Sequence, residues 1–174
     1  SFTHSPLFHR IRPIMSSLIP LLLETADPRP ERLAKILGRD KEEVERELEE
    51  LKSNETILGW MPILNPEKAD PEKVRAVIEV KISPEREGGF DRMALRISKF
   101  DEVESCYLMS GGYDLLVFVS GKNLNSVALF ISERLATIEG VLSTATHFLL
   151  RPYKEQSHLL VHEGKGEQKP SVSP

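Results

Sequence analysis

The sequence predicts an α+β protein, in which an N-terminal winged helix-turn-helix precedes a C-terminal ferredoxin-like β-α-β-β-α-β domain. Three observations lead to this prediction. Short amphipathic helices, separated by proline and glycine, account for residues 18–52. Apolar and polar residues alternate along 74–82, which is the period of a strand with one buried face. Two β-rich runs meet at Ser110-Gly111-Gly112, which is a strong hairpin signal because glycine accepts positive φ.

The first half is expected to contain three short helices, at residues 18–24, 31–37 and 41–52. Gly38 ends the second helix, since glycine adopts the left-handed conformation that follows many helices. Asp40 is the candidate N-cap of the third helix, and Glu43 would complete a capping box. A glycine-containing turn between two helices is typical of a helix-turn-helix, although a generic three-helix bundle fits the pattern equally well.

Residues 57–64 are expected to form a β-hairpin, or wing, behind the helices, and Asn65-Pro66 closes it. Trp60 would then pack between wing and helices. The domain boundaries that follow are a disordered N-terminus, or one added by cloning, at 1–16; the winged helix-turn-helix domain at 17–66; and a linker at 67–73.

The second half predicts strands at 74–82, 105–109, 113–119 and 141–150, with helices at 90–100 and 125–138. This order gives a four-stranded antiparallel sheet with both helices on one face, in a ligand-sensing and oligomerisation domain at 74–151. A loose tail is expected at 152–174, and the alternative is that its start is held against the domain. The strand 115–119 is so apolar that it is expected to be buried on both faces or central in its sheet. Asp114 is an ionisable residue where the glycine turn becomes this strand, so it is expected to need a partner.

The uncovered face of this sheet is expected to be apolar, with Leu108, Val117, Val119 and Phe148 on it beside alternate residues of 74–82. An open apolar sheet face usually pairs with a partner. The prediction is therefore a homodimer through this face.

Composition restricts the classes of function. The chain is 40% hydrophobic and 29% charged, which is ordinary for a globular protein, and no apolar run approaches the ~18 residues of a membrane span. The single cysteine, Cys106, excludes an internal disulfide and a cysteine-cluster metal site. No nucleophile motif or phosphate-binding loop is found. We therefore expect a cytoplasmic protein that is not an enzyme, with no membrane association, no cofactor and no metal.

Several motifs together resemble one family of proteins. They are Gly111-Gly112-Tyr113-Asp114-Leu115-Leu116, Ile138-Glu139-Gly140-Val141, Ser143-Thr144-Ala145-Thr146, Leu33-Ala34 followed by Gly38, and Ile57-Leu58-Gly59-Trp60 followed by Asn65-Pro66. They resemble the glycine hairpin, the threonine-rich last strand and the DNA-binding half of the Lrp/AsnC, or feast/famine, regulators. The resemblance covers roughly residues 17–150 and is strongest in the second half.

This resemblance implies a transcriptional regulator that binds double-stranded DNA, forms homodimers or higher oligomers, and senses an amino acid or related metabolite between subunits. The effector-binding positions that it implies are Gly111, Gly112, Tyr113, Asp114, Thr144 and Thr146. Exposed backbone N–H groups at a glycine turn can bind a carboxylate, and Asp114 could accept an ammonium group. The alternative is purely structural: the glycines serve the turn, Asp114 caps it, and the threonines favour a strand.

The predicted recognition helix departs from the family pattern because residues 41–52 hold three basic and six acidic side chains. DNA affinity comes largely from neutralising phosphates, so each glutamate near the DNA backbone opposes it. The candidate DNA contacts are Arg39, Lys41, Arg46 and Lys35. The alternative function is a family member that has lost DNA binding and acts as a metabolite-sensing or protein-interaction module.

An enzyme is the weakest interpretation. Relatives of this architecture include decarboxylases that act on haem precursors, for which His147, Tyr107 and Tyr113 would be the polar candidates here. A lone histidine in an alternating strand is more often a surface or interface residue, so we expect no catalysis.

Overall fold

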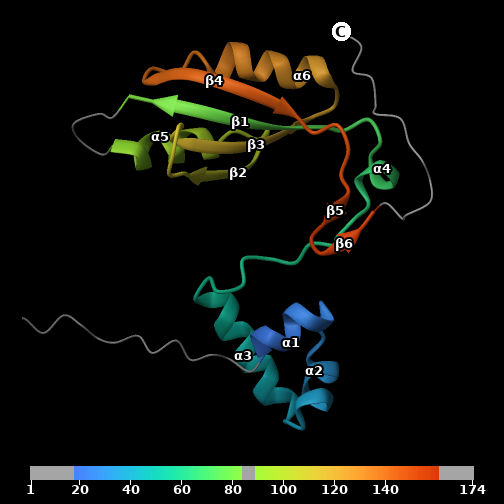
Figure 1. Cartoon of the computed structure of the whole chain (residues 1–174). Helices are drawn as coiled ribbons and strands as arrows, with labels where there is room; N and C mark the ends of the chain where they lie inside the picture. Colours follow the sequence, from blue (N-terminus) through green and yellow to red (C-terminus); the bar gives the residue numbers. More distant parts are fainter. Residues whose placement is uncertain (1–17, 84–88, 161–174) are drawn as a thin grey trace, which may run out of the picture. The chain divides into compact units, whose positions relative to one another are not determined.

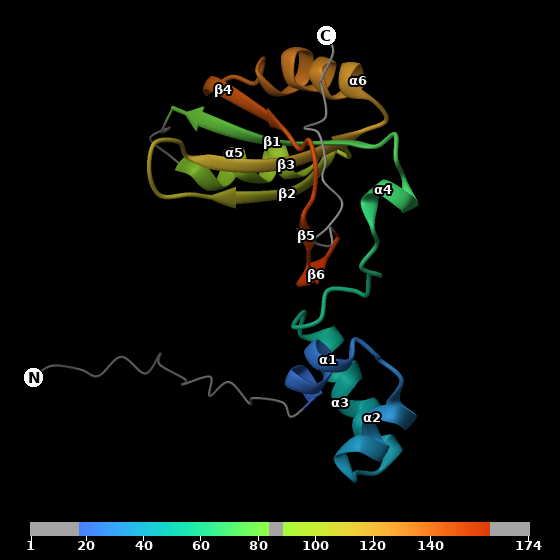
Figure 2. The ribbon, with the colours of Figure 1, turned by 45° about the vertical axis from the view of Figure 1, so that its right-hand side comes forward.

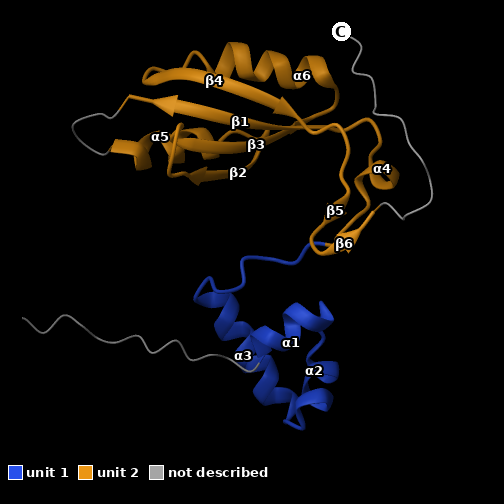
Figure 3. Cartoon of the chain, viewed as in Figure 1, with its two compact units in different colours: residues 1–61 blue, residues 62–174 orange. Residues whose placement is uncertain are grey.

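The computed structural model describes residues 18–83 and 89–160. The chain divides into two compact units, residues 1–61 and 62–174 (Figure 3). The division falls a few residues before Pro66, where the sequence placed the end of the first domain. Each unit has its own apolar core.

The described part of the first unit, from residue 18, contains three helices: α1 (Leu18–Thr25), α2 (Pro30–Leu37) and α3 (Lys41–Ser53) (Figure 1). Their buried side chains are Leu18, Leu22, Leu33, Ala34, Val44, Leu48 and Leu51. On α3 the buried positions follow a spacing of four and three, so they form one narrow stripe and leave the rest of that helix exposed.

The turn between α2 and α3 has the predicted glycine but not the predicted capping box. Gly38 adopts a left-handed conformation (φ 64°), and its N–H donates to the Ala34 carbonyl, which ends α2. Asp40 occupies the N-cap position of α3, but its side chain makes no capping hydrogen bond. Glu43 instead pairs with Arg39 at 3.0 Å. The capping-box prediction is wrong because a guanidinium attracts a carboxylate more strongly than a neutral backbone N–H does.

The predicted wing is also wrong for this chain, since residues 57–65 contain no strand. Leu58 and Met61 in this segment are each 89% exposed. A lone two-stranded hairpin is marginally stable, and Pro62 has no N–H to contribute to a ladder. The segment ends at the short helix α4 (Pro66–Ala69), whose N-cap Asn65 accepts a hydrogen bond from the Glu67 N–H.

The second unit is built on a four-stranded antiparallel sheet (Figure 1). Its strands are β1 (Val74–Ile82), β2 (Val103–Leu108), β3 (Leu115–Gly121) and β4 (Val141–Phe148), in the order β2-β3-β1-β4. The helices are α5 (Gly89–Ser98) and α6 (Leu124–Leu129), which continues as the π-helical segment η1 (Phe130–Leu135). The turned view shows α5 behind the sheet (Figure 2). The predicted β-α-β-β-α-β arrangement is confirmed.

The strand register decides which face each side chain occupies. Ile78 lies opposite Val117 on one side and Thr146 on the other, and directly opposed residues share a face. Val117 and Val119 are therefore buried beneath the helices, where Phe148 also packs. Their predicted place on the open face is wrong, because a strand's own pattern does not say which of its two faces meets the helices.

The predicted place of Leu108 on the open face is also wrong. Leu108 pairs with Leu115 and therefore lies on the helix side, at the sheet edge. The open face instead presents Val77, Glu79, Tyr107, Leu116, Phe118, Ala145 and His147, with the Tyr107 and Phe118 rings edge to face at 6.0 Å. Strand β3 is central, as predicted, but it is fully buried only on the helix side.

A short hairpin follows the sheet, formed by β5 (Lys154–Glu155) and β6 (His158–Leu159). Arg75 on β1 fixes it through an ion pair with Glu155, Nη1 to Oε2 at 3.1 Å. The start of the predicted tail is therefore held against β1. The rest of that tail, from 161, and the predicted disordered N-terminus at 1–16 lie outside the described residues.

Candidate functional site

The first predicted DNA contact, Arg39, is held by two carboxylates of α3. Its Nη2 lies 3.0 Å from Glu43 Oε1, and its Nη1 lies 2.6 Å from Glu47 Oε2. These two glutamates are one helical turn apart, so the guanidinium spans successive turns of the helix. The hydrogen bonds to Glu43 and then Glu47 raise the pKa of Arg39 above its ordinary value. Arg39 is therefore engaged within the domain.

Lys41, the first residue of α3, is engaged in a similar way. Its Nζ lies 2.7 Å from Glu31 Oε1 on α2 and 3.4 Å from Glu45 Oε1 on α3. The hydrogen bond with Glu31 raises the pKa of Lys41 and lowers the pKa of Glu31. This pair links the two helices of the helix-turn-helix.

The other two predicted contacts differ from these. Arg46 and Lys35 are exposed, and the described part of the chain gives neither of them an ion pair. At 100° per residue, Arg46 lies about 200° around α3 from the buried Val44, so it projects from the side opposite the core. The structure therefore separates the four predicted DNA contacts into two engaged cations and two exposed ones.

Sequence reasoning missed a hollow beside α3, of about 330 Å³. It is lined by Pro28, Pro30, Glu45, Leu48, Glu49, Lys52 and Trp60. The signal that could have indicated it is the pair of prolines Pro28 and Pro30, which lie just before α2 and at its first residue and line the hollow together with Trp60. The Trp60 side chain remains 47% exposed.

The predicted effector site centres on the hairpin between β2 and β3. Gly111 has φ 120°, a conformation that favours glycine, and Gly111 and Gly112 are exposed. Asp114 is tied to β1: its Oδ2 accepts from the Ile82 N–H at 2.9 Å, and its own N–H donates to the Val80 carbonyl at 3.0 Å. The backbone of β1 therefore supplies the partner that the sequence predicts for Asp114.

The threonines do not meet this hairpin within one chain. Thr144 lies opposite Val80 and Thr146 opposite Ile78, so both point to the helix-covered side, where they are half-buried. Strand β1 lies between β4 and β3. The six predicted effector residues thus form two groups: Gly111, Gly112, Tyr113 and Asp114 at the hairpin, and Thr144 and Thr146 on β4.

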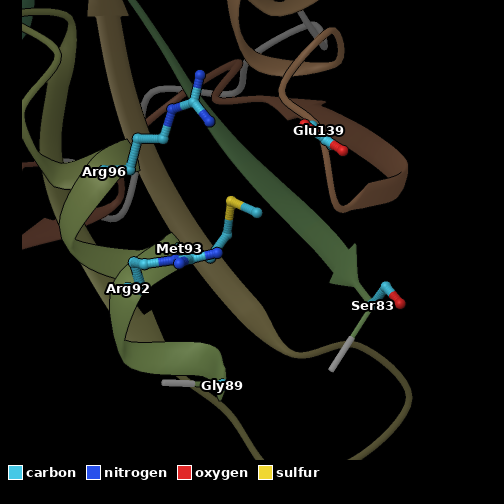
Figure 4. A pocket seen from close by; sticks show the side chains of 6 residues that line it. All are labelled: Ser83, Gly89, Arg92, Met93, Arg96 and Glu139. Atoms are coloured by element: carbon cyan, nitrogen blue, oxygen red, sulfur yellow. The ribbon is translucent and has the colours of Figure 1, made fainter. Parts of the chain in front are cut away.

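A small hollow of about 90 Å³ lies at the same end of the sheet (Figure 4). It is lined by Ser83, Gly89, Arg92, Met93, Arg96 and Glu139. Ser83 follows Ile82, the residue that binds Asp114, and the Ser83 N–H donates to the Gly140 carbonyl at 2.8 Å. Two arginines one turn apart on α5 were the sequence signal for this hollow, and sequence reasoning did not use it.

The polar residues considered for catalysis are spread over the sheet. His147 on β4 lies 3.3 Å from Glu79, Nε2 to Oε1, whereas Tyr107 is on β2, at the opposite edge of the sheet. Tyr113 is in the hairpin loop. They do not form one site in this chain.

Among residues 18–83 and 89–160, no three or more His, Cys, Asp or Glu side chains are arranged to hold a metal ion. No helix among them has the length and apolar character needed to cross a bilayer.

Residues 75–159 match the family model described as the Lrp/AsnC ligand binding domain. A Bacillus subtilis relative, the HTH-type transcriptional regulator YugG, is 38% identical over 160 residues, which cover 91% of this chain and 96% of that protein. The fold is similar to the leucine response regulatory protein LrpA of Mycobacterium tuberculosis (TM-score 0.66, 20% identity, 88% of this chain and 95% of that one).

It is also similar to a Neisseria meningitidis transcriptional regulator solved in complex with L-Met (TM-score 0.59, 23% identity, 80% of this chain and 88% of that one). The helix-turn-helix, the ferredoxin-like domain, the matched family model and the full-length relative agree. The chain belongs to the Lrp/AsnC family of transcriptional regulators.

Proposed function

We propose that this regulator is cytoplasmic and non-enzymatic, that it binds double-stranded DNA through α3, and that it senses an amino acid or related metabolite through its second unit. The observation that carries the DNA-binding part is the geometry of α2, Gly38 and α3. Three buried side chains in one stripe anchor α3 to the core. The opposite side of α3, which carries Arg46, is exposed. A helix presented in this way is what a helix-turn-helix inserts into the major groove.

Replacing Arg46 with alanine is expected to weaken DNA binding about tenfold. Arg46 is an exposed cation of α3, and among the described residues it makes no ion pair. No ion pair therefore has to break before Arg46 binds a phosphate. Losing one phosphate contact should also reduce the slope of log affinity against log salt by about 0.9. The measurement is fluorescence anisotropy of a labelled mixed-sequence DNA duplex at several salt concentrations. Lys99→Ala, which removes an exposed cation of the second unit, is the control and should leave affinity unchanged.

A specific observation favours a second candidate function. Arg39 and Lys41 already bind four carboxylates, so the start of α3 offers little free positive charge. A regulator without DNA binding would act as a metabolite-sensing or protein-interaction module. Absence of any salt-sensitive binding to the duplex, even at low salt, would favour this function over the first.

For the effector we propose an amino acid bound at the glycine hairpin, with its carboxylate on the backbone N–H groups of Gly111 and Gly112 and its ammonium near Asp114. Tyr113 would line this site, and Thr144 and Thr146 would belong to it only if a second subunit supplied them, because β1 separates them from the hairpin. The L-Met bound to the Neisseria relative makes L-methionine the first probe.

Asp114→Asn is expected to abolish L-methionine binding in isothermal titration calorimetry. The amide keeps an oxygen that can accept from the Ile82 N–H, so the hairpin should stay in place, but it removes the negative charge that attracts ammonium. The melting temperature of the variant should stay within a few degrees of the parent. Unchanged L-methionine affinity in the variant would assign Asp114 a purely structural role.

We also propose a homodimer, with higher oligomers possible, that pairs the open sheet faces of two chains. Val77, Leu116 and Phe118 are half-buried there, although no helix of the described chain covers them. An apolar sheet face of this kind is stabilised by a second copy related by twofold symmetry.

A further inference from the structure

The two engaged cations of the helix-turn-helix share an unusual arrangement, in that each is bound by two carboxylates. The Arg39 side chain is 24% exposed and that of Glu47 22%, so this pair is partly shielded from water. The Lys41 side chain is more exposed, but it pairs with Glu31 on α2 and with Glu45 on α3. All four glutamates lie where a DNA phosphate would have to approach the same N–H groups.

A phosphate and a carboxylate compete for the same donors. Both accept charge-assisted hydrogen bonds of similar geometry, and an arginine or lysine held by two carboxylates has much of its hydrogen-bonding capacity in use. A phosphate that approaches Arg39 must displace Glu43 or Glu47, and the displaced carboxylate then remains beside it as a like charge. Binding to DNA therefore includes the cost of breaking these pairs.

We infer that Glu43 and Glu47, together with Glu31 and Glu45, are positioning residues that hold Arg39 and Lys41 away from DNA and so restrain its binding. The inference rests on the proposed function, since it concerns the strength of DNA binding through α3. It states more than that α3 is acidic. It assigns the restraint to four particular carboxylates and not to the net charge of the helix.

The chain itself provides the contrast that separates these two explanations. Glu42 and Glu50 are exposed glutamates of the same helix, and no ion pair involving them is found among the described residues. They contribute to the charge of α3 equally but hold no cation. Removing their charge changes the field of the helix without releasing Arg39 or Lys41.

The test compares three double variants that change net charge by the same amount. They are Glu43→Gln with Glu47→Gln, Glu31→Gln with Glu45→Gln, and the control Glu42→Gln with Glu50→Gln. The probe is the labelled mixed-sequence DNA duplex, titrated at several salt concentrations. Ion pairs at the surface contribute little to stability, so all three variants should remain folded, which circular dichroism checks. Two independent cation-releasing variants guard against one of them failing to fold.

We expect each cation-releasing variant to bind the duplex about tenfold more tightly than the parent, with a salt slope steeper by about one unit for the cation released. The control should gain clearly less and keep the parent slope. An equal gain in all three variants would overturn the inference, because net charge alone would explain it, while salt-sensitive binding by the parent would leave the proposed function standing.

Two further outcomes are informative. Binding by the cation-releasing variants alone, with none by the parent or the control, would support the inference in its strongest form. No binding by any of the four proteins at low salt would overturn both this inference and the proposed DNA-binding function.

Discussion

Replacing Phe118 with glutamate should prevent the proposed homodimer from forming. Phe118 lies on the open sheet face, half-buried and in edge-to-face contact with Tyr107. In a twofold dimer the same face is used by both partners, so one substitution places two carboxylates in one interface. Burying unpaired charge costs several kcal/mol, and each 1.4 kcal/mol is a tenfold change in affinity. We expect the dimer to be weakened by at least about a hundredfold.

Size-exclusion chromatography with light scattering, at micromolar protein, measures this change directly. Leu129→Glu is the matched control, since Leu129 on α6 is 44% exposed and lies on the helix side of the sheet. The control should keep the mass of the parent. A Phe118→Glu protein that remains dimeric would show that the subunits associate through another surface, and circular dichroism would establish that both variants are folded.

Truncating Ile78 to alanine should destabilise the second unit by about 2–5 kcal/mol and leave the first unit unaffected. Ile78 is fully buried at the centre of β1, with β3 on one side and β4 on the other. The removed methyl and methylene groups leave a cavity that a sheet paired on both sides cannot close by collapse. The core of the first unit shares no residue with this one, so its stability should not change.

The single tryptophan makes the two units distinguishable in urea. Trp60 belongs to the first unit, so its fluorescence reports that unit, whereas far-ultraviolet circular dichroism is sensitive to the sheet of the second. With m-values of about 1–3 kcal/mol/M, the circular dichroism midpoint should fall by at least about 0.7 M. Leu48→Ala, in the first core, should produce the reverse pattern. Both signals shifting together in either variant would mean that the units unfold as one.

The sequence was sufficient to predict the fold wherever a local pattern determines the structure. Alternation along 74–82 predicted β1 to the residue, and Gly38 ends α2 as its lack of a side chain requires. The sequence was insufficient wherever the position of a side chain depends on residues distant in the chain. The face occupied by Val117 follows from its register with Ile78 and from the helices above it, neither of which is encoded in β3 alone.

The candidate sites show the same division. The sequence identified Asp114 as an ionisable residue that needs a partner, and the structure supplied the Ile82 amide. It identified Arg39 and Lys41 as possible DNA contacts by residue type, but not that Glu47 and Glu31 would bind them, because these ion pairs depend on how the turn and α2 pack against α3. The capping box was predicted from spacing alone, and the competing arginine lay one residue outside that motif.

The order of the strands also has a consequence for how the protein is made. Strand β1 is synthesised first, yet it lies inside the sheet, and its two neighbours, β3 and β4, follow some forty and seventy residues later. Until β4 leaves the ribosome, one edge of β1 has no hydrogen-bonding neighbour from its own chain, and such an edge is open to pairing with other nascent chains. The synthesis of β4 therefore also determines when, during translation, the edge of β1 is protected from pairing with other chains.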